Sequence, residues 1–260
     1  MKESYYLDWY GVDGSVWPLN QHQSGARLLE LSGLTATPER SHLQNASGVG
    51  AAHTATTYKP LEGELEVLLS ESLSHQRYGG LGWLYRRFNQ AFSTTHPGKL
   101  VITPPHSIAW EIDAVLDKPI ETPKKNPDSQ THMQVTIPLL SHDGIWHQRE
   151  PDVYTSGQAI KNNGDLDLYP TIEWSGSSQW FRIANTNERL PNVNGTHRLS
   201  LDPATGWAVT DNSGNQAIHH WREFRGKAFP FVIAPGQEKT ITASSGVRII
   251  SRQRVETPWR

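Results

Sequence analysis

Hydrophobic and polar residues alternate in three stretches of the chain. A period of two places one set of side chains on a core and the other set on the opposite face of a sheet. These stretches predict three long β-strands, whose apolar positions are Leu61, Leu65, Val67 and Leu69; Ile108, Trp110, Ile112, Ala114 and Leu116; and Met133, Val135, Ile137 and Leu139.

Shorter stretches rich in β-branched and aromatic residues predict further strands, because such side chains fit a half-buried pleated surface. These strands are expected at residues 5–10, 27–31, 99–103, 171–174, 180–184, 198–201, 239–243 and 247–251.

One segment has a helical period instead. Its apolar residues fall on a single stripe of a helix, formed by Leu81, Leu84, Tyr85, Phe88, Ala91 and Phe92. A pair of glycines precedes the stripe, and Pro97-Gly98 follows it, as is typical of helix ends. The pattern predicts one helix at about residues 80–93, packed on a sheet.

Two segments carry polar and turn-forming residues without a clear period. Residues 35–57 are poor in large apolar side chains and long for a structureless loop, so we expect this segment to be irregular, and either mobile or ordered by a partner. Residues 141–163 contain several turn pairs and are expected to be an irregular boundary between two β units. The predicted domains are residues 1–150 and 160–260.

The composition supports a mainly β protein. The 260 residues include 21 Gly, 17 Pro and 24 aromatic residues, and only 19% of residues are charged. Many aromatic and turn residues with few helix-forming runs are typical of all-β proteins.

Charge and cysteine content exclude several classes of protein. The formal net charge is −2, whereas proteins that wrap DNA or bind anionic membranes through basic segments carry a positive excess. The chain has no cysteine, which removes disulfide frameworks, thiolate metal sites and cysteine nucleophiles. It has no run of eighteen apolar residues and no apolar leader at its N-terminus, so we expect no membrane span and no signal peptide.

Candidate chemical sites are sparse. His142, Asp143 and His147 form the closest histidine group, but a turn-rich linker provides neither fixed ligand positions nor supporting contacts for a metal. Glu62, Glu64 and Glu66 share one face of a predicted strand at a spacing that glycosidases can use; a solvated strand face explains the same pattern more simply.

The ten tryptophans raise the possibility of carbohydrate stacking. Trp110 shares the inward face of an alternating strand with Ile108 and Ile112 and is expected in a core. Four tryptophans of the second unit, Trp174, Trp180, Trp207 and Trp221, cannot be placed by pattern alone. Most are expected to be core or interface residues.

From Asn162 onward, several segments resemble the distal tail proteins (Dit-like minor tail proteins) of long, flexible-tailed phages. The similar segments, in the order of that family, are Asn163 to Gly176, Arg182 to Thr186, Leu199 to Asp202, Gly206 to Val209 and Phe229 to Gln237. In the first of these, an Asn-x-Gly-Asp turn provides a residue that tolerates positive φ. Pro235-Gly236 fits the centre of a type II turn.

The first half of the chain matches that family more loosely. Ser32 to Thr35, a polar excursion, a long strand pair, one helix and Gly98 to Ile102 follow the order of the family. At the domain junction many relatives have Asp-Pro followed by an aromatic residue and Trp, whereas this chain has Asp143-Gly144-Ile145-Trp146.

The resemblance implies a mainly β architecture. Its parts would be an N-terminal split β-barrel or sandwich domain with one α-helix and a C-terminal galectin-like β-sandwich. It also implies a structural phage tail-tip (baseplate) protein and virion component, made in the host cytoplasm. The N-terminal domain would form a homo-oligomeric ring, a hexamer in this family, around the channel through which DNA passes as cargo.

The same resemblance implies the partners. The ring would join the tail tube protein to the tail-tip hub protein and anchor receptor-binding proteins or contact host surface glycan, without a membrane. Residues 35–57 would be an arm that reaches a neighbouring subunit. We expect no enzymatic activity and no catalytic, cofactor-binding or metal site. Two alternatives are a carbohydrate-binding β-sandwich module and a β-sandwich glycan hydrolase or lyase.

Overall fold

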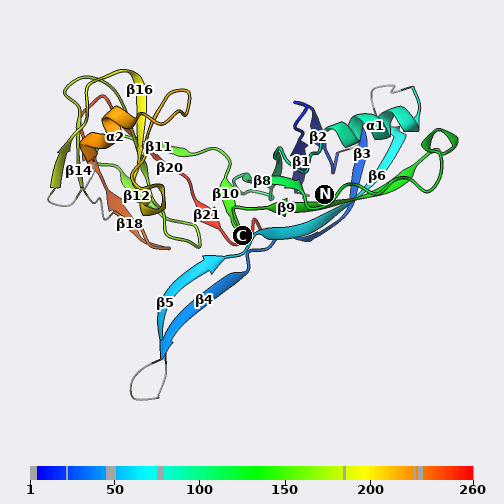
Figure 1. The fold of residues 1–260 in the computed structure, drawn as a ribbon, viewed down its shortest axis with the longest axis horizontal. Coiled ribbons are helices and arrows are strands. Elements are labelled where there is room, and N and C mark those ends of the chain that lie inside the picture. Colours follow the sequence, from blue (N-terminus) through cyan, green and yellow to red (C-terminus); the bar gives the residue numbers. More distant parts are fainter. Residues whose placement is uncertain are drawn as a thin grey trace. The chain divides into compact units, whose positions relative to one another are not determined.

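The computed structural model describes residues 5–21, 23–44, 51–74, 79–183, 186–224, 227 and 231–259. The chain forms two compact units (Figure 1). Unit 1 comprises Met1–Arg149 with Glu256–Arg260, and unit 2 comprises Glu150–Val255.

Unit 1 is built on one antiparallel sheet whose strands follow the order β2-β1-β7-β8-β9-β6-β3. The bounds are β1 (Tyr6–Tyr10), β2 (Val16–Pro18), β3 (Ser24–Gly33), β6 (Leu61–Ser74), β7 (Gly98–Thr103), β8 (Trp110–Leu116) and β9 (Met133–Ser141). A short strand, β10 (Trp146–Gln148), pairs with β8. Two strands outside this path, β4 (Pro38–Gln44) and β5 (Ala51–Tyr58), form a separate hairpin.

The sheet of unit 1 curls into a split barrel. Its two ends meet where the backbone N–H of Leu28 donates to the carbonyl of Leu19 at 2.5 Å. The opposite side is open, because β8 and β9 pair only through Val115 with Leu140 and Leu116 with Leu139.

The predicted helix is α1 (Leu81–Gln90), and its apolar stripe faces the interior. Phe88 meets the ring of Trp17 edge-on at 5.0 Å, and Phe92 stacks on Trp9 at 4.7 Å. The indole N–H of Trp9 donates to the carbonyl of Ala91 at 3.0 Å, which satisfies an acceptor at the end of the helix. A 3₁₀ turn, η1 (Pro127–Ser129), lies in the loop between β8 and β9.

Unit 2 contains three small sheets. One has the order β11-β20-β13-β16-β17, one has the order β15-β14-β19, and β12 pairs with β18. The bounds are β11 (Asp152–Tyr154), β12 (Ala159–Lys161), β13 (Thr171–Gly176), β14 (Trp180–Ile183), β15 (Thr186–Arg189), β16 (Val193–Ser200), β17 (Val209–Asp211), β18 (Glu238–Thr240), β19 (Thr242–Ala243), β20 (Val247–Ser251) and β21 (Arg254–Val255). Two short helical segments are η2 (Pro203–Thr205) and α2 (Ile218–Phe224).

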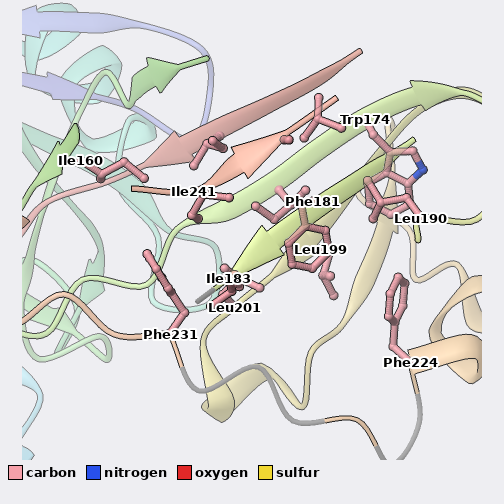
Figure 2. Close-up of a cluster of buried hydrophobic side chains, with 14 of the residues drawn as sticks. Ile160, Trp174, Phe181, Ile183, Leu190, Leu199, Leu201, Phe224, Phe231 and Ile241 are labelled. Carbon is pink, nitrogen blue, oxygen red and sulfur yellow. The ribbon is translucent and has the colours of Figure 1, made fainter. Parts of the chain in front are cut away.

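The sheets of unit 2 enclose a common core (Figure 2). Trp174 and Leu199 come from the five-stranded sheet, Phe181 and Ile183 come from the three-stranded sheet, and Ile160 comes from β12. All five side chains are buried. Unit 2 is therefore held together by apolar side chains that meet between its sheets.

Most strand predictions agree with the structure. Apart from Met133, which is half-buried, and Ile108, the apolar positions of the three long strands are buried as expected. Each shorter predicted strand overlaps an observed one, and residue 184 lies outside the described residues. Ile108 is an exception: it precedes β8 and is 45% exposed, so its placement on the core face was wrong.

The prediction of two irregular segments was wrong. Between residues 35 and 57, the structure has β4 and most of β5, while residues 45–50 lie outside the described part. Between residues 141 and 163 it has β10, β11 and β12. Polar strands were missed because each lacks the apolar alternation that identifies a half-buried strand.

The reason expected for glycine in the Asn-x-Gly-Asp turn, a positive φ, was wrong. Gly164 does not have a positive φ; instead, a Cβ at this position would collide with the backbone carbonyl of Arg254. The buried Asn162 side chain accepts from the N–H of Gly164 and donates to the carbonyls of Leu166 and Ile233. The other turn is confirmed: Gly236 has φ +74°, and the N–H of Gln237 donates to the carbonyl of Ala234.

A buried histidine lies where α2 meets the five-stranded sheet. The ring of His197 on β16 meets His220 of α2 edge-on at 5.1 Å and lies 5.9 Å from Trp174. Burial is the main cause that lowers the pKa of His197, and the nearby His220 lowers it further, while Asp211 on β17 acts in the opposite direction. The Nδ1 atom of His197 has no hydrogen-bond partner among the described residues.

This arrangement predicts a pH-dependent stability of unit 2. The unfolded chain binds a proton on His197 at its ordinary pKa of about 6.5, whereas the folded chain binds it only at lower pH. Stability is therefore full above about pH 6.5 and is lost as the pH falls through the lowered pKa. In urea unfolding at about pH 7.5 and about pH 5, His197→Gln is expected to reduce the loss seen in the wild-type protein. The matched control is His142→Gln, because His142 is exposed; equal losses in both variants would contradict the assignment.

Candidate functional site

The three glutamates of β6 lie on the solvent side of the unit 1 sheet. Glu62 and Glu64 are exposed, and Glu66 is half-buried and accepts a hydrogen bond from the side-chain amide of Gln134 at 2.8 Å. Their strand neighbours Leu65 and Val67 point to the core. None of the three carboxylates lines the hollow between α1 and β9 or the two smaller hollows beside α1. This geometry is that of a solvated strand face.

The histidine group near residue 145 brings only two of its members together. The Nε2 atom of His147 lies 3.9 Å from the carboxylate of Asp143, and His142 is exposed. Among the described residues, no three His, Asp or Glu side chains converge in a way that could hold a metal ion.

The tryptophans do not form an exposed platform on unit 2. Trp174 is buried, and its indole N–H donates to the carbonyl of Pro191 at 3.0 Å. Trp180, Trp207 and Trp221 are half-buried, and the last two pack against the core cluster. In unit 1, Trp110 is buried as expected. The large exposed indoles, Trp83 and Trp259, are both in unit 1.

A different feature of unit 1 is a hairpin that stands apart from the sheet. The hairpin formed by β4 and β5, which we call the arm, extends away from the sheet (Figure 1). It pairs with no other strand among the described residues. The side chains of residues 39–43 and 55–57 are exposed along it, and Leu43 is 66% exposed. An isolated two-stranded ribbon is only marginally stable in water, so the arm is the candidate contact surface of unit 1.

The base of the arm is fixed to unit 1 on its β4 side. Leu34 is buried with φ +55°, which is uncommon for a residue with a side chain. Its backbone N–H donates to the carbonyl of Glu62 at 2.8 Å, and its carbonyl accepts from the indole N–H of Trp146 at 2.8 Å. The N–H of Ala36 donates to the carbonyl of Glu256 at 3.0 Å. These bonds determine the direction in which β4 leaves the barrel.

The β5 side of the base is held as well. The hydroxyl of Tyr58 donates to the carboxylate of Glu256 at 2.9 Å, and the ammonium of Lys59 lies 2.9 Å from the carboxylate of Glu39. Gly144 has φ +72°, and a Cβ there would lie 2.7 Å from the carbonyl of Lys59. Proline cannot adopt a positive φ. Position 144 of this chain therefore could not hold the proline that distal tail proteins often have there.

Sequence reasoning located the arm but missed its structure. Its polar strands gave no apolar signal, although the threonines at residues 54, 56 and 57 have high β-propensity.

None of the described helices is long and apolar enough to cross a membrane.

No protein-family model matches the sequence, and no curated protein is similar to it in sequence. The fold, however, is similar to solved structures. The Dit protein of phage SPP1, described as a paradigm of the hub adsorption apparatus in phages that infect Gram-positive hosts, superposes with a TM-score of 0.59 at 13% identity, over 97% of this chain and 99% of that one.

Chains from two structures of the phage P2 baseplate in its activated conformation are also similar. In the calcium form the TM-score is 0.55 at 10% identity, over 96% of this chain and 98% of that one. In the strontium form it is 0.54 at 9% identity, with the same shares covered. The chain therefore has the mainly β fold of a Dit-like distal tail protein.

Proposed function

We propose that this protein is a structural component of a phage tail tip, and that it acts without catalysing a reaction. The observation that carries the proposal is that a Dit fold extends over nearly the whole of this chain and nearly the whole of the SPP1 protein. A fold shared over both units is more informative than a match to one β-sandwich, because single sandwiches serve many unrelated functions.

In this proposal, copies of the chain associate into a ring, with six copies as the expected number. A contact between two different surfaces of identical subunits closes into a ring when the rotation between subunits closes. The arm provides one such surface, since it is exposed in the single chain. Residues 1–150 would form the ring, and residues 160–260 would form an outer galectin-like domain.

The ring would connect the tail tube protein to the tail-tip hub protein and anchor receptor-binding components. DNA would pass through it as cargo. The protein would be part of the virion. The positions of the tryptophans and of Glu62, Glu64 and Glu66 give little support to the alternatives of a carbohydrate-binding module and a glycan hydrolase or lyase.

The experiment that tests the function is the mass and shape of the purified protein. Light scattering at increasing concentration is expected to show association toward a single closed oligomer, and electron microscopy is expected to show a ring with a central hole. A protein that stays monomeric at all concentrations, and also with tail tube or hub protein added, would contradict the proposal.

A substitution on the arm is expected to weaken association without unfolding the chain. Leu43 is exposed in the single chain, so Leu43→Asp leaves the fold intact. Burial of a leucine at an interface stabilises by about 1.5–3 kcal/mol, so loss of this contact is expected to weaken association about tenfold or more.

The matched control for this variant is Ile218→Asp, because Ile218 is a similarly exposed side chain at the start of α2 in unit 2. Sedimentation velocity measures both variants. Equal association of Leu43→Asp and Ile218→Asp would show that the arm does not take part in the contact.

A further inference from the structure

The sequence contains two Asn-Gly steps, Asn163-Gly164 and Asn194-Gly195, and both lie in unit 2. An asparagine that precedes a glycine is chemically labile, because the backbone nitrogen of the glycine can attack the side-chain carbonyl carbon of the asparagine. Glycine favours this attack, since it has no Cβ to block the approach and its backbone is conformationally free. The structure around each step decides whether it reacts in the folded protein, and the two steps differ in that respect.

The reaction exchanges an amide for an acid without a cofactor or an oxidant. The glycine nitrogen gives up its proton and forms a bond to Cγ of the asparagine, and the bond from Cγ to the side-chain nitrogen breaks. Ammonia leaves with that proton, and a five-membered succinimide ring remains. Water then adds to one of the two ring carbonyls and opens the ring, which gives aspartate or its backbone isomer isoaspartate. The reaction therefore needs a glycine nitrogen that is not held elsewhere and room for the ring.

The step Asn163-Gly164 is held in place. Gly164 is buried, and its N–H donates to the side-chain oxygen of Asn162 at 2.9 Å and to that of Gln253 at 3.2 Å. The N–H of Asn163 donates to the same oxygen of Gln253 at 3.1 Å. Attack by the nitrogen of Gly164 would first have to break the hydrogen bonds of its N–H, within a turn that is packed against the backbone of Arg254.

The step Asn194-Gly195 lies at an irregular point of β16. The register shifts there, so that Val193 and Thr196 are opposite two successive residues of β13. Asn194 and Gly195 thus have no opposite residue in β13, and β17 pairs with β16 only over residues 197–199. The extra residues of a β-bulge are left out of the ladder in this way. Both residues of the step are exposed.

The surroundings of Gly195 leave room for the ring. Its φ of +82° belongs to a region that residues with a side chain rarely adopt. Beyond its chain neighbours, no atom lies within 4 Å of the position that a Cβ would occupy. Outside the sheet ladders, no described backbone carbonyl accepts a hydrogen bond from its N–H. The residue type that suits the bulge is therefore also the residue type that makes Asn194 labile.

We propose that Asn194 is a site of spontaneous deamidation in the folded protein, through a succinimide formed with the nitrogen of Gly195, and that Asn163 is protected. This modification goes beyond the proposed role in a tail tip and does not depend on it.

The product changes the surface and the backbone of unit 2. Deamidation puts a carboxylate on β16 in place of a neutral amide, and isoaspartate also lengthens the backbone there by one carbon. The ring of His197 hydrogen-bonds to the backbone of Gly195 and meets the ring of His220 at 5.1 Å. The modification therefore acts on a residue that supports the contact between β16 and α2.

The test follows both asparagines in one sample of the full chain. The folded protein is incubated in mildly alkaline buffer, digested with trypsin and analysed by mass spectrometry with fragmentation. Trypsin separates the two sites into the peptides 162–182 and 190–198. Asn194 is expected to convert at least about tenfold faster than Asn163, because the hydrogen bonds of Gly164 must be broken first. A sample digested without incubation corrects for conversion during the digestion.

Two controls separate the effect of structure from that of sequence. In urea, where the bulge and the turn are both lost, the two asparagines are expected to convert at similar rates. The variant Asn194→Gln is expected to keep its amide in the folded protein, because a glutamine would have to form a larger ring. Circular dichroism checks that this substitution of an exposed residue leaves the fold intact.

Equal conversion of Asn163 and Asn194 in the folded protein would overturn the inference. An Asn194 that keeps its amide in the folded protein while it reacts in urea would overturn it as well. Either result leaves the proposed tail-tip role standing, since that role is tested by the mass and shape of the protein.

Discussion

Backbone N–H and C=O groups inside a protein must be hydrogen-bonded, because leaving them unpaired away from water costs free energy. In unit 1 the strands satisfy this constraint around most of the barrel, and Leu19 and Leu28 join its two ends. No other described strand pairs with the arm, which extends from the sheet with exposed side chains. In the proposed assembly a second copy of the chain would contact the arm, which is why the arm and the proposed role belong together.

Side-chain and backbone contacts hold both α1 and the base of the arm firmly in unit 1. The aromatic contacts of Trp9, Trp17, Phe88 and Phe92 fix α1 on the barrel. The bonds of Leu34 and Trp146 fix the start of the arm. An element held firmly at its base loses less conformational entropy when its exposed part binds.

The sequence predicted best where burial and periodicity act on the same residues. Leu65, Val67 and Ile112 alternate with polar neighbours and are buried as expected. Ile108 continues the same series but lies before the strand begins, because periodicity alone does not say where pairing stops. The helix α2 was not expected, since only Phe224 among its seven residues is buried and so short a segment shows no stripe. The arm was missed because its strands β4 and β5 pair with each other but carry no apolar alternation.

The central claim is that this chain completes its sheets with copies of itself, and amide hydrogen exchange tests it most directly. The measurement compares dilute protein with the assembled form, for the amides of β4 and β5. The account predicts slow exchange of these amides only after assembly, with the amides of β7 slow in both states. Equal, fast exchange of the arm in both states would contradict it.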